Sequence, residues 1–137
     1  MEKQSEELVS LVWEKALKVE GYDSTRFRQD ACGAWIIRDA YGKRDNPFGW
    51  EIDHIYPKSK LEESGVPQEL IDDIRNLRPL NWMNNDSKGK DYPSYRARVE
   101  ANGNNNVEGS YEFTINQGVI ESINELFNFG GILIIPK

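Results

Sequence analysis

The sequence predicts an α+β fold, and three features of its pattern lead to that class. Apolar residues recur at helical spacing near the N-terminus, β-rich runs bounded by turn residues occupy the centre, and a strand–helix–strand pattern closes the chain. The chain has 137 residues, of which 38% are hydrophobic and 11% aromatic. This is the size and composition of one domain with its own hydrophobic core, so we expect a single domain over residues 1–137.

The N-terminal region, residues 5–20, is expected to be helical. Apolar residues over 5–18 follow the i, i+3, i+4 spacing of an amphipathic helix, with Ser5 as a plausible N-cap and Gly21 as a stop. Trp13 is expected to anchor this helix in the core. A second, short helical turn is expected at residues 26–30.

The centre of the chain predicts two strands, at residues 32–37 and 50–55. A loop rich in turn residues separates them at 41–47, and another loop is expected at 60–66. Pro67 is suited to open a short helix. The expected buried side of that helix consists of Leu70, Ile71 and Ile74.

A short extended segment is expected at residues 77–80, because the residue before Pro79 is biased away from helical geometry. Residues 81–88 then predict a short helix that Asn81 could cap. Asn, Asp and Ser are poor helix formers. A conflict between local sequence and structure is typical of functional sites.

The C-terminal extension, residues 107–137, predicts a β-α-β arrangement. Its elements are expected at 111–115, 117–128 and 132–135. The polar segment 101–106 is the best candidate for a mobile junction before it.

Composition excludes several classes of protein. No apolar run approaches the roughly 20 residues of a membrane span. The polar, acidic start lacks the features of a signal peptide, so a cytoplasmic location is expected. A lone Cys32 excludes an internal disulfide framework and a cysteine-rich zinc site, and we expect it to be a small buried hydrophobe.

Charge is distributed unevenly along the chain. The net charge is −6, which argues against tight non-specific binding of nucleic acid. Residues 1–25 carry −3 and residues 99–137 carry −4, whereas residues 26–98 carry +1 and nearly all the cations. A phosphate-binding surface is therefore expected in the middle of the chain, although most of these cations are expected to be solvated.

The chemistry-bearing residues lie in that middle region. Asp53 and His54, the only histidine, stand near the end of a predicted strand, where a carboxylate and an imidazole offer a metal ligand and a base. Asn85 and Lys88 are i and i+3 in a predicted helix and so share one face. An oxygen ligand and a cation on one face suit a metal–phosphate site.

The order of these blocks resembles the HNH endonuclease family. The blocks are Asp-His-Ile-x-Pro-x-Ser from Asp53, Asn-Leu-x-Pro-Leu from Asn76, and Asn-x-x-Lys from Asn85. The resemblance covers about residues 31–92 and implies a ββα-metal core. It also implies hydrolysis of phosphodiester bonds in nucleic acid, with DNA expected over RNA.

The resemblance implies a role for each matched residue. Asp53 would be a metal ligand, and His54 the general base that takes a proton from the attacking water. Asn76 would hold the loop between the two strands and so help to orient His54. Asn85, where many family members have histidine, would be the second metal ligand. Lys88 would face the phosphate.

Arg78 is the further cation that we expect to bind the substrate beside Lys88. For the neighbouring cations, phosphate contacts and solvation both remain open interpretations. They are Lys43, Arg44, Lys58 and Lys60. Trp35, Trp50 and Trp82 are expected to serve as core residues rather than as platforms for stacked bases.

One carboxylate and one amide oxygen suit a single Mg²⁺ or Mn²⁺ ion better than Zn²⁺. No structural zinc is expected, because the paired cysteines that brace many family members are missing. Two other interpretations stay open: an HNH-fold module that binds nucleic acid without cutting it, and a protein-interaction domain that uses the acidic ends of the chain.

Overall fold

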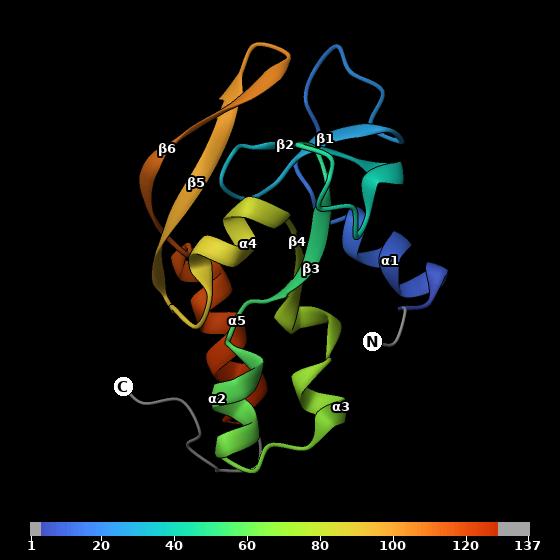
Figure 1. Cartoon of the computed structure of the whole chain (residues 1–137). Coiled ribbons are helices and arrows are strands. Elements are labelled where there is room, and N and C mark those ends of the chain that lie inside the picture. Colours follow the sequence, from blue (N-terminus) through green and yellow to red (C-terminus); the bar gives the residue numbers. More distant parts are fainter. Residues whose placement is uncertain (1–3, 129–137) are drawn as a thin grey trace.

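The computed structural model describes residues 4–128, which form five α-helices and three two-stranded antiparallel sheets (Figure 1). Two short 3-10 turns, Arg38–Ala40 and Ile74–Asn76, complete the regular structure of that part of the chain. The mixture of helices and antiparallel strands confirms the expected α+β class.

Helix α1, Glu6–Trp13, is shorter than the helix expected over residues 5–18. Ser5 caps it as predicted, with its side chain accepting from the backbone N–H of Leu8. The helix ends early because the Arg28 guanidinium donates to the carbonyls of Trp13, Glu14 and Ala16. The chain then pairs Leu17 with Gln29 as an isolated bridge. A distant arginine therefore satisfies the helix end, which no local pattern indicates.

The helical turn expected at residues 26–30 is wrong, since these residues form strand β1, Phe27–Gln29. It pairs with β2, Trp35–Ile37, which is the C-terminal half of the strand expected at 32–37. The hydrogen bonds of this pairing outweigh the weak helical propensity of residues 26–30. Gly33, at φ +85°, makes the turn between the two strands.

Strand β3, Trp50–His54, and strand β4, Leu77–Asn81, pair in antiparallel register, with Asp53 opposite Arg78. β4 runs directly into α4, Trp82–Lys88, and Asn81 caps this helix as expected by accepting from the N–H of Met83. α4 lies between the β3–β4 hairpin and strand β5 (Figure 1).

The connection between β3 and β4 carries two helices, α2 (Lys58–Glu63) and α3 (Gln68–Ile71). The loop expected at residues 60–66 is wrong at 60–63, where buried Leu61 stabilises the end of α2, and correct at 64–66. The buried side predicted for the helix that follows Pro67 is wrong at Ile74. Ile71 is fully buried, whereas Ile74 is 39% exposed.

The junction expected to be mobile at residues 101–106 is instead a tight hairpin. β5, Ser94–Asn102, pairs with β6, Asn105–Thr114, and Gly103 at φ +61° starts the two-residue turn. Hydrogen bonds from the Trp35 indole to Gly103 and from the Asn106 amide to Trp35 hold the hairpin in place. The strand expected at 111–115 is thus the end of a longer one.

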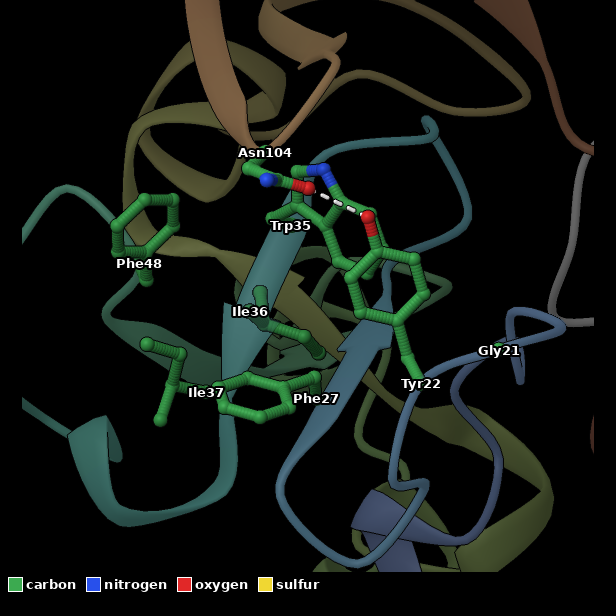
Figure 2. A pocket seen from close by; sticks show the side chains of 8 residues that line it. All are labelled: Gly21, Tyr22, Phe27, Trp35, Ile36, Ile37, Phe48 and Asn104. Carbon is green, nitrogen blue, oxygen red and sulfur yellow. Dashed lines mark hydrogen bonds between the residues drawn. The ribbon is translucent and has the colours of Figure 1, made fainter.

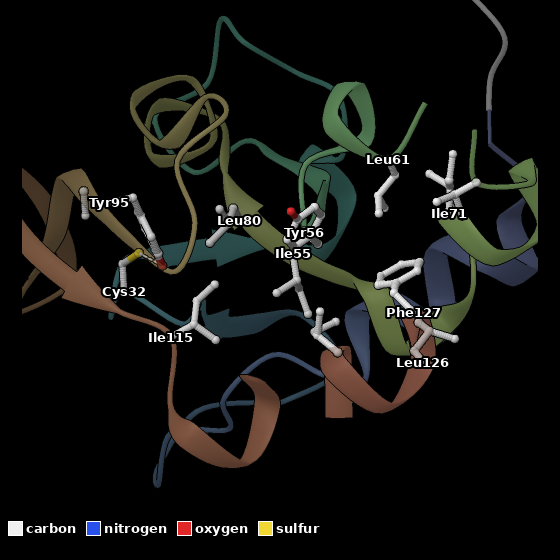
Figure 3. Close-up of a cluster of buried hydrophobic side chains, with 13 residues drawn as sticks. Cys32, Ile55, Tyr56, Leu61, Ile71, Leu80, Tyr95, Ile115, Leu126 and Phe127 are labelled. Carbon is white, nitrogen blue, oxygen red and sulfur yellow. Dashed lines mark hydrogen bonds between the residues drawn. The ribbon is translucent and has the colours of Figure 1, made fainter. Parts of the chain in front are cut away.

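Helix α5, Gln117–Phe127, agrees with the helix expected at 117–128. The expected strand at 132–135 lies outside the described residues. Leu126 and Phe127 pack in the same cluster as Tyr56, Leu61 and Ile71 (Figure 3). α5 thereby supports the segment that follows β3. Trp13, Trp35 and Trp50 are buried as expected, and so is Cys32, whereas Trp82, also expected in the core, is only partly buried.

A fully buried carboxylate, Asp30, connects three parts of the fold. Its two oxygens accept from the N–H groups of Cys32 and Ala34 in the β1–β2 turn, from the N–H of Asn81, and from the amide of Asn84. Burial raises the pKa of Asp30, and these four hydrogen bonds oppose that rise. The carboxylate therefore ties the start of α4 to the first sheet.

Replacing Asp30 with alanine is expected to lower the free energy of unfolding by about 3–5 kcal/mol, because four buried donors lose their acceptor. Urea denaturation measures this loss. The control is Asp39→Ala at an exposed position, which should change stability by less than about 0.5 kcal/mol. Equal stability of the two variants would contradict the role of Asp30.

Candidate active site

The end of β3, the neighbouring strand β4 and the end of α4 bring one carboxylate and two cations together. Asp53 Oδ2 accepts from Arg78 Nε at 2.9 Å, and Asp53 Oδ1 lies 3.3 Å from Lys88 Nζ. The exposed fractions of the side chains are 5% for Asp53, 11% for Arg78 and 0% for Lys88. The fold therefore brings Asp53 together with Arg78 and Lys88, which lie 25 and 35 positions further along the chain, in a region that is largely shielded from solvent.

The electrostatics of this cluster depend on Asp53. Burial is the main effect on Lys88 and lowers its pKa, whereas the Asp53 carboxylate acts in the opposite direction. Burial also opposes the charge on Arg78, but Asp53, with smaller contributions from Tyr95 and Cys32, offsets it and leaves the pKa of Arg78 above its usual value. Arg78 donates further to the Tyr95 hydroxyl at 3.0 Å. One carboxylate thus compensates two buried cations, as buried charges require.

His54 is the last residue of β3 and lies at the edge of this cluster. Its ring Nε2 is 2.8 Å from Asp72 Oδ1, and its backbone carbonyl accepts from Lys88 Nζ at 3.2 Å. The imidazole is 22% exposed, so solvent reaches it. On a strand, neighbouring side chains point to opposite faces. The ring consequently meets Asp72 after α3, while Asp53 meets α4.

Asn76 is fully buried and braces the segment after His54. Its Oδ1 accepts from the N–H of Tyr56, and its Nδ2 donates to the carbonyls of Tyr56 and Ile71. These bonds hold the chain after β3 against the end of α3. The side chain that contacts the imidazole is Asp72, so any effect of Asn76 on His54 passes through the backbone.

Asn85 projects from α4 toward β3 and meets a different carboxylate. Its Nδ2 donates to Glu51 Oε1 at 2.9 Å. Glu51 and Asp53 are two residues apart on one strand, so both face α4. Asn85 and Lys88 of α4 therefore contact Glu51 and Asp53, respectively, on the same face of β3.

Arg44 closes the far end of this acidic face. Its guanidinium binds Glu51 at 2.7 and 2.9 Å and Asp86 at 2.9 and 3.0 Å. The loop before β3 is thereby tied to both β3 and α4. Arg44, for which phosphate contact and solvation were both open, is half-exposed and paired with two carboxylates.

Sequence reasoning missed Glu51, Asp72 and the pairing of Arg44. Glu51 had a usable signal, since a carboxylate two residues before Asp53 must share its face of the strand. Asp72 had none, because it lies 18 residues from His54 and reaches it only through the fold of α2 and α3.

Glu51 gives a pH-dependent stability that can be measured. Burial tends to raise its pKa, but hydrogen bonds from Arg44 and Asn85 outweigh burial and hold the pKa below its usual 4.5. A folded-state pKa below the unfolded one means that the stabilisation is present above pH 4.5 and is lost as the pH falls through the folded value.

We therefore expect wild type to exceed Glu51→Gln in stability by about 1 kcal/mol at pH 7. The difference should shrink toward zero as the pH falls from about 6 to about 3. Urea denaturation of both proteins across this range measures it, and the subtraction cancels the other carboxylates. A difference that stays constant with pH would contradict the network around Glu51.

The donor set at the strand face matches the chemistry of a hard cation. Carboxylate oxygens of Asp53 and Glu51 and the amide oxygen of Asn85 are ligand types that Mg²⁺ and Mn²⁺ prefer. Within residues 4–128, no group of three or more His, Cys, Asp or Glu side chains is arranged to hold a metal ion. Arg78 and Lys88 each contact one Asp53 oxygen, so a metal ion bound to Asp53 would have to displace one of these two cations.

Two cavities of the described structure have similar volumes, and one of them borders the cluster. One of about 610 Å³ reaches Arg78 from the side of α1 and α5 and also contacts Lys15 and Arg75. Another, of about 580 Å³, is lined by aromatic and aliphatic side chains between the first sheet and the β5–β6 turn (Figure 2). There, the Tyr22 hydroxyl hydrogen-bonds to Asn104, and its ring packs 4.6 Å from that of Trp35.

Across residues 4–128, no helix is long and apolar enough to cross a membrane.

The comparisons with known proteins give no match. No family model, curated protein or solved structure matches this chain.

Proposed function

We propose that this protein is a metal-dependent endonuclease of the HNH type, and that β3, β4 and α4 form its ββα-metal core. The observation that carries the proposal is the convergence on one strand. A hairpin runs directly into a helix, and that helix returns Asn85 and Lys88 to the strand that ends in Asp53 and His54. All three sequence blocks of the family resemblance meet there.

His54 is the group suited to accept a proton from water. It is partly exposed, whereas the neighbouring ionic groups Asp53, Arg78 and Lys88 are enclosed. A neutral imidazole has a free ring nitrogen and is the side chain most often used as a general base. Asn76 holds the backbone on which this ring stands.

Asp53 and Asn85 are the proposed ligands of one Mg²⁺ or Mn²⁺ ion, with Glu51 as the adjacent carboxylate. Such an ion stabilises the negative charge that develops on a phosphodiester during hydrolysis. Lys88 and Arg78 fix the Asp53 carboxylate from two directions. Because Lys88 is fully buried, its main contact is with Asp53. A contact of Lys88 or Arg78 with the substrate phosphate stays a prediction.

The proposed substrate is DNA. The cations concentrate in residues 26–98, but the net charge of −6 and the internal pairing of Arg44, Arg78 and Lys88 leave few for phosphate contacts. Binding should accordingly be modest.

We expect the affinity for a short DNA duplex to fall roughly tenfold between about 50 and 200 mM salt, as two or so phosphate contacts require. Fluorescence anisotropy without divalent metal measures this. Affinity that does not change with salt would show that the contacts are not ionic.

The proposal is tested by incubating the purified protein with supercoiled plasmid and Mg²⁺, Mn²⁺ or excess chelator. Nicked or linear product should form with metal and vanish with chelator. If no metal supports cleavage of plasmid, single-stranded DNA or RNA, the proposed activity is wrong.

One observation favours the alternative, a module that binds nucleic acid without cutting it. Both Asp53 oxygens are held by buried cations, and an ion must compete with Lys88 for one of them. Salt-sensitive binding of DNA together with an absence of cleavage under all metals would select this alternative.

A further inference from the structure

We propose that Asp72 is the positioning residue of His54, and that it fixes the proton of the neutral ring on Nε2 so that Nδ1 faces the water. This inference rests on the proposed nuclease function and assigns a residue that the family resemblance did not include. It is carried by the 2.8 Å contact between His54 Nε2 and Asp72 Oδ1.

The Asp72 carboxylate is held from two sides. Its second oxygen accepts from Gln68 Nε2 at 2.8 Å, one helical turn earlier. Asp72 is the C-cap residue of α3, so its backbone is set by that helix. A carboxylate with both oxygens engaged has a defined direction, which it passes on to the imidazole.

Asn76 fixes the distance between the two partners. Its side chain bonds to Tyr56, two residues after His54, and to Ile71, one residue before Asp72. The segments that carry the ring and the carboxylate are thus joined by one fully buried amide. This explains how Asn76 orients His54 without touching it.

Other charges near the ring act on the same pair. Lys58 of α2 lies near Asp72, Lys88 of α4 donates to the His54 carbonyl, and Asp53 precedes His54 on β3. Burial tends to raise the pKa of Asp72, but hydrogen bonds from His54 and Gln68 outweigh it and hold the pKa low. The carboxylate is therefore ionised at neutral pH and can only accept hydrogen bonds.

The carboxylate acceptor beside Nε2 determines which ring nitrogen of His54 carries the proton. In the neutral imidazole the proton must be on Nε2, which leaves the lone pair on Nδ1. In the reaction, an O–H bond of water breaks and its proton forms the N–H bond at Nδ1. The electron pair left on oxygen forms the new bond to phosphorus as the bond to the leaving oxygen breaks. Asp72 then faces an imidazolium and stabilises it.

The chain offers an unusually clean test, because His54 is its only histidine. ¹⁵N NMR of the imidazole, at a pH about two units above the pKa of an ordinary histidine, reports which nitrogen carries the proton. The variant is Asp72→Asn, and the matched control is Asp73→Asn. Asp73 is the adjacent acid, and it pairs with Arg75 instead of the ring.

Wild type and Asp73→Asn should both show the proton on Nε2, and Asp72→Asn should lose this preference. For plasmid nicking, kcat of Asp72→Asn should fall about 10–100-fold with KM nearly unchanged, and Asp72→Glu should recover part of the loss. Equal kcat in Asp72→Asn and Asp73→Asn, or an unchanged Nε2 proton, would overturn the proposal.

The NMR readout separates this proposal from the proposed function. If the tautomer depends on Asp72 but no variant cuts nucleic acid, the contact stands, whereas the nuclease function and the catalytic role of Asp72 are both wrong. If wild type cuts but the tautomer is indifferent to Asp72, only the positioning role is wrong.

Discussion

Replacing His54 with alanine is expected to lower the rate of plasmid nicking by about 10²–10⁴-fold, the usual contribution of a general base. The fold should survive the change. The ring is 22% exposed and its one side-chain partner, Asp72, is 47% exposed, so their pairing should contribute less than about 1 kcal/mol to stability.

Initial rates of nicking under saturating Mn²⁺, with thermal unfolding of the same samples, measure both effects. His54→Gln is the matched control for side-chain size and polarity, because it keeps hydrogen bonding but lacks a base near neutral pH. Both variants should be equally impaired. Full activity in either variant would show that the cleavage comes from another residue or from a contaminant.

Replacing Asp53 with alanine is expected to lower the free energy of unfolding by about 3–5 kcal/mol, in addition to abolishing cleavage. The variant leaves Arg78 and Lys88 buried without the carboxylate that compensates them. An unpaired buried charge is among the strongest single sources of instability.

A double-mutant cycle isolates this effect from the loss of packing. Lys88→Met alone should cost much less, because Asp53 keeps Arg78. Adding Lys88→Met to Asp53→Ala should recover part of the stability, since one unpaired cation is removed. Strictly additive losses in urea denaturation, or a loss below about 1 kcal/mol for Asp53→Ala, would contradict the buried cluster.

Elements with strong local signals were predictable from the sequence. Ser5 and Asn81 cap their helices as expected, and the helix from Gln117 lies where it was expected. The strand ending in Asp53 and His54 was found from its β-rich run closed by Pro57. In each case the local pattern and the tertiary structure agree.

The failures share one cause, which is stabilisation by partners outside the element itself. Residues 27–29 are a strand because β2 pairs with them, and α1 ends at Trp13 because Arg28 satisfies its carbonyls. The polar run at 101–106 resembled a flexible linker, but its Gly103 turn closes a long hairpin. Periodicity describes one element at a time and does not show which segments pair with each other.

The candidate site was predictable in part of its membership, since Glu51 and Asp72 were missed, but not in its pairings. The sequence placed Asn85 and Lys88 on one helix face, and the structure turns both toward β3. Which acid each meets depends on the register of β3 against α4, which no motif encodes. The contact of His54 with Asp72 depends on the fold of a 22-residue connection, and sequence alone gave no access to it.

The most direct measurement of the central claim is a crystal structure of the protein with Mn²⁺, using the anomalous signal of the metal. We expect one ion within coordination distance of a carboxylate oxygen of Asp53 and the amide oxygen of Asn85, with Lys88 shifted away from Asp53. Saturating Mn²⁺ with no ion at these oxygens, and Asp53 still paired with Lys88 and Arg78, would contradict the account.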